Sequence, residues 1–224
     1  MVDANAKPRT ALLAGATGLV GRELLALLLH SRDYATVHAL VRRTSPHIDA
    51  APRLKIHEVD FARLPLLPAV DDVFIALGTT IKAAGSKEAF RQVDFDLVVD
   101  VARIARAQGA TRLGVVSAMG ADPAARVFYS RVKGEMEMEI VRLGYDSVAI
   151  AHPSLLVGDR GALGQPVRPG EFWATRLVAP LAFLMPRDLR PIPAQAVAGA
   201  LLAAVHDAQP GVRVLKSGEM RTYL

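Results

Sequence analysis

A tyrosine and a lysine four positions apart are the residues of this sequence best suited to acid–base chemistry. Tyr129 and Lys133 lie in a stretch, 124–143, with helical periodicity, and positions i and i+4 share one face of a helix. A tyrosine with an ordinary pKa of about 10 exchanges protons poorly at neutral pH, but an adjacent ammonium favours its phenolate. Ser117, earlier in the chain, could hydrogen-bond a substrate oxygen and orient it. These three residues predict a catalytic centre that moves a proton to or from a substrate oxygen.

Three glycines spaced three positions apart could bind a phosphate group. Gly15, Gly18 and Gly21 lie between a short apolar run, 10–14, and a helix-length stretch, 19–30. Glycines at this spacing permit a tight turn, close approach of the backbone to a pyrophosphate, and close helix–strand packing. The helix that follows would supply amide donors from its N-terminus. Because the turn belongs to the first strand–helix unit, it predicts a dinucleotide site.

Two arginines, Arg42 and Arg43, end the second apolar strand pattern. A site selective for NAD usually carries Asp or Glu at this point to bind the ribose 2′-hydroxyl, whereas a 2′-phosphate requires a cation. Guanidinium groups match phosphate oxygens with forked donors, and no acidic residue occurs between Val41 and Ile48. We therefore expect NADP(H) as the cofactor. The alternative is a pair of solvated surface arginines in a chain rich in arginine.

The elements that must position these residues alternate between short apolar runs and helical patterns, with no hairpin signals. Strands are expected over 10–14, 36–41, 54–59, 72–77, 112–116, 147–151 and 212–215, and helices over 19–30, 87–108, 124–143, 171–185 and 194–207. This alternation predicts an α/β protein with a doubly wound parallel sheet, the Rossmann fold. We expect a single domain, 1–224, in which 158–224 contributes a small helical cap on the substrate side.

The composition excludes several classes of protein. A chain of 224 residues that is 51% hydrophobic and 22% charged can bury a full core. Cysteine is absent, which excludes a disulfide scaffold and a cysteine nucleophile. The most apolar late stretch, 172–186, is too short for a membrane span and is interrupted by Arg176 and Pro180. With no secretory signal order at the start, we expect a cytoplasmic protein without a membrane span.

Other patterns of polar residues favour no additional chemistry. The glycines near Lys87 lack the spacing of a nucleotide-binding phosphate loop, and no hydrolase elbow surrounds Ser117. The histidines show no metal-ligand spacing, so no metal site is expected. Glu135, Glu137 and Glu139 alternate with methionines, which predicts a solvated face of the helix.

The combination of motifs resembles the short-chain dehydrogenase/reductase superfamily. More narrowly, the sequence is similar to the atypical branch that contains the HIV Tat-interacting-protein oxidoreductases. The narrower resemblance rests on Phe74-Ile-Ala-Leu-Gly-Thr-Thr80, Val132-Lys-Gly-Glu-Met-Glu137 and Arg168-Pro-Gly-Glu171. It covers nearly the whole chain and implies an NADPH-binding Rossmann fold with a tyrosine/lysine reductase centre.

The resemblance also implies contacts to the cofactor, position by position. The phosphates would be contacted by Thr17, Gly18, Leu19 and Val20, the 2′-phosphate by Arg42 and Arg43, the adenosine ribose side by Leu77 and Gly78, and the nicotinamide end or entrance by Leu156 and Arg168. One departure is His152-Pro153-Ser154, where relatives often have Arg-Pro-Gly. We expect a structural role for His152, because the acid–base work is assigned to Tyr129.

These expectations lead to one preferred function and two alternatives. The preferred function is an NADPH-dependent oxidoreductase that acts on a small carbonyl or alcohol substrate, as a monomer or homodimer. The first alternative is a non-catalytic NADPH-binding sensor or adaptor. Nucleic-acid binding is not expected, because the arginines are scattered and aromatic residues for stacking are few.

Overall fold

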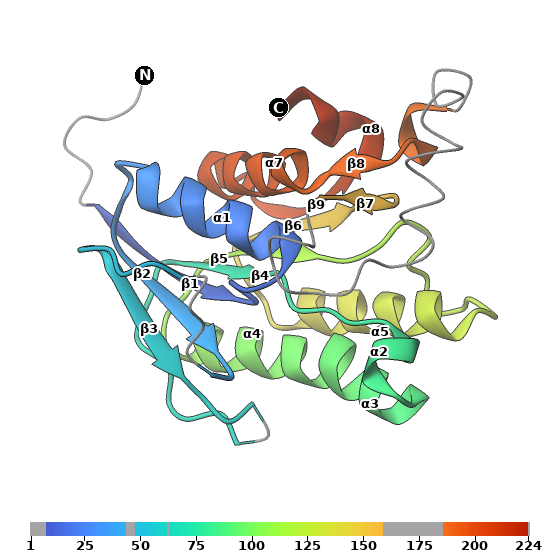
Figure 1. The fold of residues 1–224 in the computed structure, drawn as a ribbon, viewed down its shortest axis with the longest axis horizontal. Coiled ribbons are helices and arrows are strands. Elements are labelled where there is room, and N and C mark those ends of the chain that lie inside the picture. The colour runs from blue at the N-terminus through green and yellow to red at the C-terminus, as the bar shows by residue number, and fades with distance from the viewer. Residues whose placement is uncertain (1–7, 44–47, 62, 159–185, 224) are drawn as a thin grey trace.

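The computed structural model describes residues 8–43, 48–61, 63–158 and 186–223. Its centre is a seven-stranded sheet in which every neighbouring pair of strands is parallel (Figure 1). The strands are β1 (Arg9–Ala14), β2 (Tyr34–Val41), β3 (Leu54–Glu58), β4 (Asp72–Ile75), β5 (Arg112–Val116), β6 (Ser147–His152) and β9 (Gly211–Lys216). This confirms the predicted doubly wound α/β fold.

The order of the strands places the crevice in which a ligand is expected. Across the sheet the order is β3-β2-β1-β4-β5-β6-β9, so the chain winds outward in both directions from β1 and β4. In open parallel sheets, ligands bind at the carboxyl ends of the strands where the winding direction changes. The loops after β1 and β4 are therefore the expected floor of a site.

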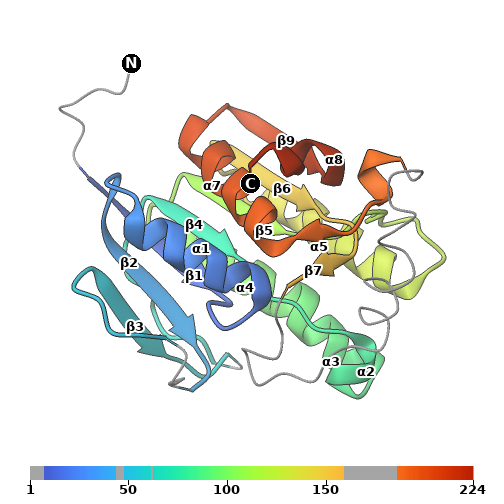
Figure 2. The same cartoon turned by 45° about the horizontal axis from the view of Figure 1, so that its top comes forward.

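Two layers of helices cover the two faces of the sheet. Helices α1 (Leu19–His30) and α7 (Ala194–Asp207) lie on one face, and α4 (Leu97–Ala107) and α5 (Phe128–Arg142) lie on the other (Figures 1 and 2). Alternate residues of a strand point to opposite faces. In β1, Leu13 packs in the core with α1 and α7, and Leu12 packs in the core with α4 and α5.

One expected helix is broken into three parts. The pattern over 87–108 predicts a continuous helix, but the structure has α3 (Lys87–Arg91), a π-helical turn η1 (Gln92–Asp96) and then α4. The amide of Leu97 bonds the carbonyl of Gln92, the five-residue spacing of a π turn. The prediction of an unbroken helix is wrong. A single π turn differs little from an α-helical turn in its spacing of apolar residues, so the sequence pattern did not reveal it.

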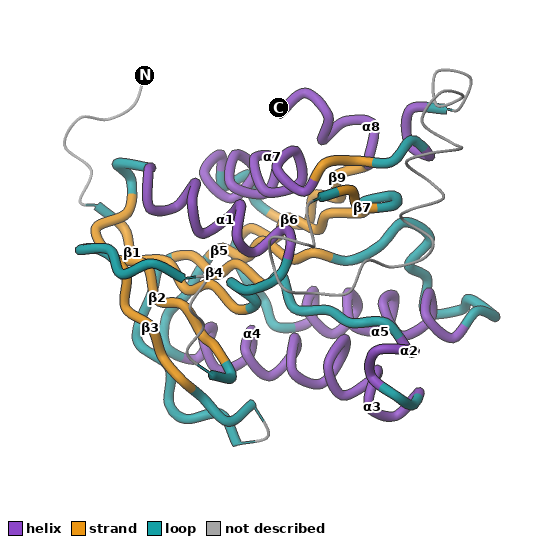
Figure 3. Tube along the Cα trace, in the orientation of Figure 1, coloured by secondary structure: helices purple, strands orange, loops and turns teal. Residues whose placement is uncertain are grey.

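Shorter elements complete the described chain (Figure 3). They are α2 (Ile81–Ala84), β7 (Leu156–Val157), η5 (Arg187–Leu189), β8 (Ile192–Pro193), α8 (Ser217–Met220) and η6 (Arg221–Tyr223). Strand β9 joins the main sheet, as expected, and the helix predicted over 194–207 is confirmed. The predicted loop 159–170 and helix 171–185 lie outside the described residues. Within the described ranges, every helix falls short of the length and apolar character that crossing a bilayer requires.

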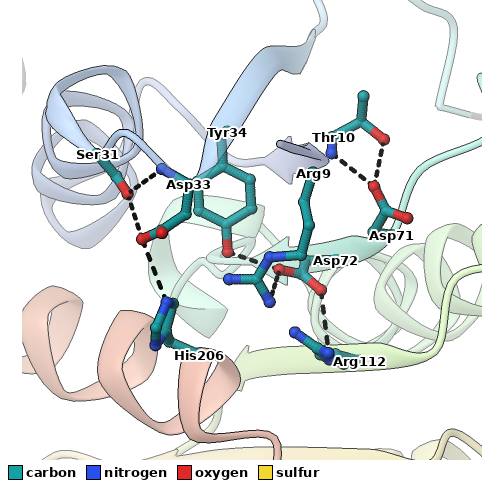
Figure 4. A network of polar contacts seen from close by, with 9 residues as sticks. All are labelled: Arg9, Thr10, Ser31, Asp33, Tyr34, Asp71, Asp72, Arg112 and His206. Carbon is teal, nitrogen blue, oxygen red and sulfur yellow. Dashed lines mark hydrogen bonds and ion pairs between the residues drawn. The ribbon is translucent and has the colours of Figure 1, made fainter. Parts of the chain in front are cut away.

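A buried polar cluster holds the amino ends of four strands together (Figure 4). Asp72 is fully buried, and its carboxylate accepts a hydrogen bond of 2.6 Å from the Tyr34 hydroxyl. Arg9 lies 3.1 Å from one carboxylate oxygen, and Arg112 lies 3.9 Å from the other. Burial raises the pKa of Asp72 and also that of Tyr34. Each of these residues is the first of its strand, so the cluster fixes the edge of the sheet opposite the expected ligand site.

Candidate functional site: the carboxyl edge of the sheet

The glycine turn after β1 is built so tightly that side chains would not fit. Gly15 has a φ of 93°, and a Cβ there would lie 2.6 Å from the backbone carbonyl of Ala76, which follows β4. A Cβ on Gly21 would lie 1.9 Å from the Gly15 oxygen. Gly18 immediately precedes α1 and donates its amide to the Gly15 carbonyl at 3.0 Å. The turn therefore brings α1 directly against the ends of β1 and β4, as the spacing predicted.

The first turn of α1 is open to an anion. Its N-cap residue, Gly18, has no side chain to cap it, and the first turn contains no acidic residue. Thr17 is exposed, Leu19 is half-buried and the Val20 side chain packs in the core. Backbone amides, rather than side chains, are thus the groups that a phosphate would meet here. The predicted phosphate contacts through Thr17, Gly18, Leu19 and Val20 fit this geometry and stay predictions.

Arg42 and Arg43 follow β2, the strand next to β1, and both are exposed. Because parallel strands end at the same edge, both arginines lie at the same carboxyl edge of the sheet as the glycine turn. Neither makes an ion pair with the described residues of the chain. Their charges are available for an anionic ligand.

Lys133 is buried and paired. Its ammonium lies 2.7 Å from a carboxylate oxygen of Asp94, and the exposed fractions of the two side chains are 4% and 1%. The other carboxylate oxygen of Asp94 accepts the amide of Thr79 at 2.8 Å. A Cβ on Gly78 would lie 3.9 Å from the Lys133 ammonium, so the loop after β4 passes over this pair. The structure thus brings Gly78 and Lys133 together.

Tyr129 lies one helical turn before Lys133, near the start of α5. It is half-buried, and its ring packs against that of Phe90 with the ring centres 5.4 Å apart. The predicted pairing of Tyr129 and Lys133 on neighbouring turns of one helix is present. The ammonium, however, is balanced by Asp94 and does not act as an isolated positive charge.

Ser117, the first residue after β5, bonds Glu137, which in turn contacts His152, and the sequence did not connect these residues. The Ser117 hydroxyl donates to the Oε1 atom of Glu137. That carboxylate oxygen also lies 2.8 Å from the ring Nε2 of His152. Glu137 lies two turns along α5 from Tyr129, about 12 Å along the helix axis. The prediction that Glu137 belongs to a solvated face is wrong, because its carboxylate joins α5 to the ends of β5 and β6. That Ser117 orients a substrate oxygen stays a prediction.

The remaining predicted site residues lie around the glycine turn or outside the described chain. Leu77 continues the loop after β4, and Leu156 forms part of β7. Gly158, just after β7, lies so close to Leu19 that a Cβ would be 2.9 Å from that side chain. The segment that contains Leu156 therefore approaches the start of α1. Arg168 lies outside the described residues.

Sequence reasoning missed Asp94, although its position carries a signal. Phe90, Val98 and Val101 are fully buried and form the apolar stripe of this helical region, and Asp94 falls within that stripe. A charged residue on a buried stripe requires a charged or hydrogen-bonding partner. That rule would have indicated a buried ion pair, but not that the partner is Lys133.

The comparisons with known proteins agree with this geometry. Residues 15–148, more than half of the chain, match the model of a family described as NAD(P)H-binding. The chain is 36% identical over 151 residues to "Protein FMP52, mitochondrial" of Eremothecium gossypii, covering 67% of each chain. It is 36% identical over 178 residues to the protein of the same name from Aspergillus fumigatus, covering 76% of this chain and 74% of that one. The expected cytoplasmic location is corrected by these relatives, which are named as mitochondrial proteins.

Solved structures with low sequence identity share the fold. A structure titled "MoeE5 in complex with UDP-glucose and NAD" has a TM-score of 0.69 at 18% identity, over 92% of this chain and 75% of that one. A short chain dehydrogenase family protein from Francisella tularensis has a TM-score of 0.64 at 13% identity, over 95% and 99%. The narrower resemblance to Tat-interacting-protein oxidoreductases stays a prediction. With the family match, the fold and the glycine turn, the chain belongs to the NAD(P)H-binding family and has the Rossmann fold of short-chain dehydrogenases.

Proposed function

We propose that this chain is an NADP(H)-dependent oxidoreductase that acts on a carbonyl/alcohol pair. The observation that carries the proposal is the convergence at one edge of the sheet of the glycine turn and Lys133. The turn has no room for a side chain at Gly15 or Gly21, and the lysine lies beside Gly78 in the loop after β4. A dinucleotide laid across the ends of β1 and β4 would have its phosphates at α1 and a ribose near Lys133.

The chemistry requires one hydride and one proton. The nicotinamide group, when bound, supplies or accepts the hydride at the substrate carbon. Tyr129 donates a proton to the substrate oxygen during reduction and takes it back during oxidation. Lys133 holds the nicotinamide ribose. Ser117 is assigned to orient the substrate oxygen, which requires its hydroxyl to leave the Glu137 carboxylate. The half-buried ring of Tyr129, supported by Phe90, suits a residue that must hold a fixed position.

The preference for NADP(H) over NAD(H) is assigned to Arg42 and Arg43. Both are exposed at the end of β2, beside the strand that leads into the glycine turn. Guanidinium groups bind phosphate oxygens through paired, charge-assisted hydrogen bonds. The names of the fungal relatives favour a mitochondrial location for this protein as well.

The test is a screen of aldehydes, ketones and quinones in which the oxidation of NADPH is followed. Wild-type protein is expected to turn over at least one class. Tyr129→Phe should abolish that turnover and leave the dissociation constant of NADPH nearly unchanged. Tyr223→Phe, the same change near the other end of the chain, serves as the control.

Two results would count against these roles. Equal loss of turnover and of NADPH binding in Tyr129→Phe would contradict the assignment of Tyr129. If the wild-type protein bound NADPH but oxidised it with none of the compounds, the alternative of a non-catalytic NADPH-binding sensor would be favoured.

A further inference from the structure

The buried pair of Lys133 and Asp94 connects three separate parts of the chain. Lys133 lies on α5, Asp94 lies in the π turn η1, and Thr79 lies in the loop after β4. One carboxylate thus binds an ammonium from one element and a backbone amide from another. It fixes the loop that contains Leu77 and Gly78 relative to the lysine.

The local backbone is shaped to aim Asp94 at this point. A π turn is less stable than a regular α-helical turn, and such turns occur often at functional sites. Here the turn spans Gln92–Asp96 and interrupts an otherwise buried apolar stripe with an aspartate that is 1% exposed. A buried ion pair adds little net stability, because removing two charges from water offsets their attraction. Stability alone therefore does not account for this arrangement.

The pair leaves part of the lysine available on the side of the ligand crevice. An ammonium has three N–H donors, and Asp94 is the one partner of Lys133 among the described residues. Gly78 borders the same pair, and a Cβ there would lie 3.4 Å from the Asp94 carboxylate and 3.9 Å from the ammonium. Glycine at this position keeps side-chain atoms away from that side of the pair, which the backbone itself encloses.

We propose that Asp94 is a positioning residue for the nucleotide, acting through Lys133 and through the loop that it ties down at Thr79. The inference rests on the proposed nucleotide site and adds Asp94 to it. With its charge balanced, Lys133 serves the nucleotide as an aimed hydrogen-bond donor. Nucleotide affinity then depends on the carboxylate at position 94 as much as on the lysine.

The test is a double-mutant cycle on the dissociation constant of NADPH, measured by fluorescence titration of the full chain. Asp94→Asn keeps an oxygen for the Thr79 amide and removes the charge that aims the lysine. Asp94→Asn and Lys133→Met are each expected to weaken NADPH binding about tenfold, the scale of one hydrogen bond to a charged group. The double variant should bind no more weakly than the weaker single variant, because both changes remove one interaction. Asp100→Asn, an exposed acid on the neighbouring helix α4 paired with Arg103, is the matched control.

Three results would overturn the inference, and one of them would also overturn the proposed function. Unchanged affinity in Asp94→Asn would show that the carboxylate has no part in binding. A double variant about a hundredfold weaker, the product of two tenfold losses, would show that Asp94 acts independently of Lys133. Wild-type protein that binds no NADPH would remove the nucleotide site itself, and this is distinguishable because it needs no variant.

A second variant tests the side of the pair that Gly78 borders and leaves both charges in place. Gly78→Ala places a methyl group over the pair without a backbone clash, because its nearest neighbours lie at 3.4 and 3.9 Å. We expect an unchanged melting temperature and NADPH binding at least about fivefold weaker. Gly120→Ala has no atom within 4 Å but a φ of 76°, which strains any side chain, so it is a control for the NADPH affinity and not for the melting temperature. Unaltered NADPH affinity in Gly78→Ala would contradict a ligand on that side of the pair.

Discussion

Two buried aspartates lie at opposite edges of the same sheet and have different surroundings. Asp72, at the amino edge, is bonded by Tyr34 and paired with Arg9, whose side chain is 17% exposed. Asp94, at the carboxyl edge, is paired with Lys133, which is 4% exposed. The first aspartate has cations that reach solvent, whereas the second has a cation enclosed with it.

The neighbours of the two clusters differ in the same way. Around Asp72, four strands each contribute their first residue, and the contacts close the edge of the sheet (Figure 4). Around Asp94, the nearest loop contributes a glycine, so no side chain at position 78 packs on the enclosed pair. In parallel α/β sheets the carboxyl edge is where ligands bind. We therefore expect substitution of Asp94 to affect ligand binding and substitution of Asp72 to leave it unchanged.

The largest expected effect is at the glycine turn on the carboxyl edge. Gly15→Ala combines a left-handed backbone with a Cβ only 2.6 Å from the Ala76 carbonyl. We expect a loss of about 4 kcal/mol in the free energy of unfolding, from conformational strain and overpacking together. Gly85→Ala has a similar φ of 90° but no atom within 4 Å, and should lose only about 1 kcal/mol. Urea unfolding of both variants measures the difference, and equal losses would contradict the close packing of the turn.

The next effect separates the two aspartates directly. Asp94→Asn leaves Lys133 buried without a countercharge and should lower the free energy of unfolding by about 3 kcal/mol. Adding Lys133→Met should restore most of that loss, because no unpaired charge then remains. Chemical denaturation of the single and double variants provides the measurement. A double variant less stable than Asp94→Asn alone would contradict this, because it would show that Lys133 stabilises the fold even without its countercharge.

The smallest effect is expected at Asp72, and it depends on pH. Asn can still accept from Tyr34, and Arg9 reaches solvent, so Asp72→Asn should change the free energy of unfolding by less than about 1 kcal/mol at neutral pH. Burial raises the pKa of Asp72, so this group's contribution to stability is complete below its unfolded pKa of about 4. That contribution is lost as the pH rises through the higher folded pKa.

Asp72→Asn does not titrate at this position. Its free energy of unfolding, relative to that of the wild type, should therefore increase as the pH rises from 3 to 7. Denaturation curves across that range measure the trend. If the stability of the variant relative to the wild type instead decreased with rising pH, the ionised carboxylate would be stabilising the fold.

The sequence alone was sufficient to predict the alternating strands and helices and the glycine turn. Each short apolar run became a strand, and the glycine spacing located the crevice, because both depend on neighbouring positions. The π turn and the partners of Lys133 and Ser117 were missed. Asp94 and Lys133 come from elements far apart in the chain, and their meeting depends on how α5 packs beside the helical region that contains η1. The periodicity of one segment holds no information about such a pairing.

The same limit applies to Glu137. Its alternation with methionines predicts a solvated face, yet Met136 is fully buried and Glu137 bonds Ser117 and His152. The departure at His152 was noticed from the sequence, and the structural role expected for it stays a prediction. Its partner became evident only from the packing of α5 against β6.

The central claim is that the carboxyl edge binds a dinucleotide with a 2′-phosphate. It is tested most directly by the dissociation constants of NADPH and NADH for the wild type and for the Arg42→Ala/Arg43→Ala variant. An Arg103→Ala/Arg142→Ala variant, which removes two exposed arginines elsewhere, is the control. The account predicts that wild-type protein binds NADPH at least about tenfold more tightly than NADH, and that only the Arg42/Arg43 variant loses this preference. Equal affinities in the wild type, or tighter binding of NADH, would contradict it.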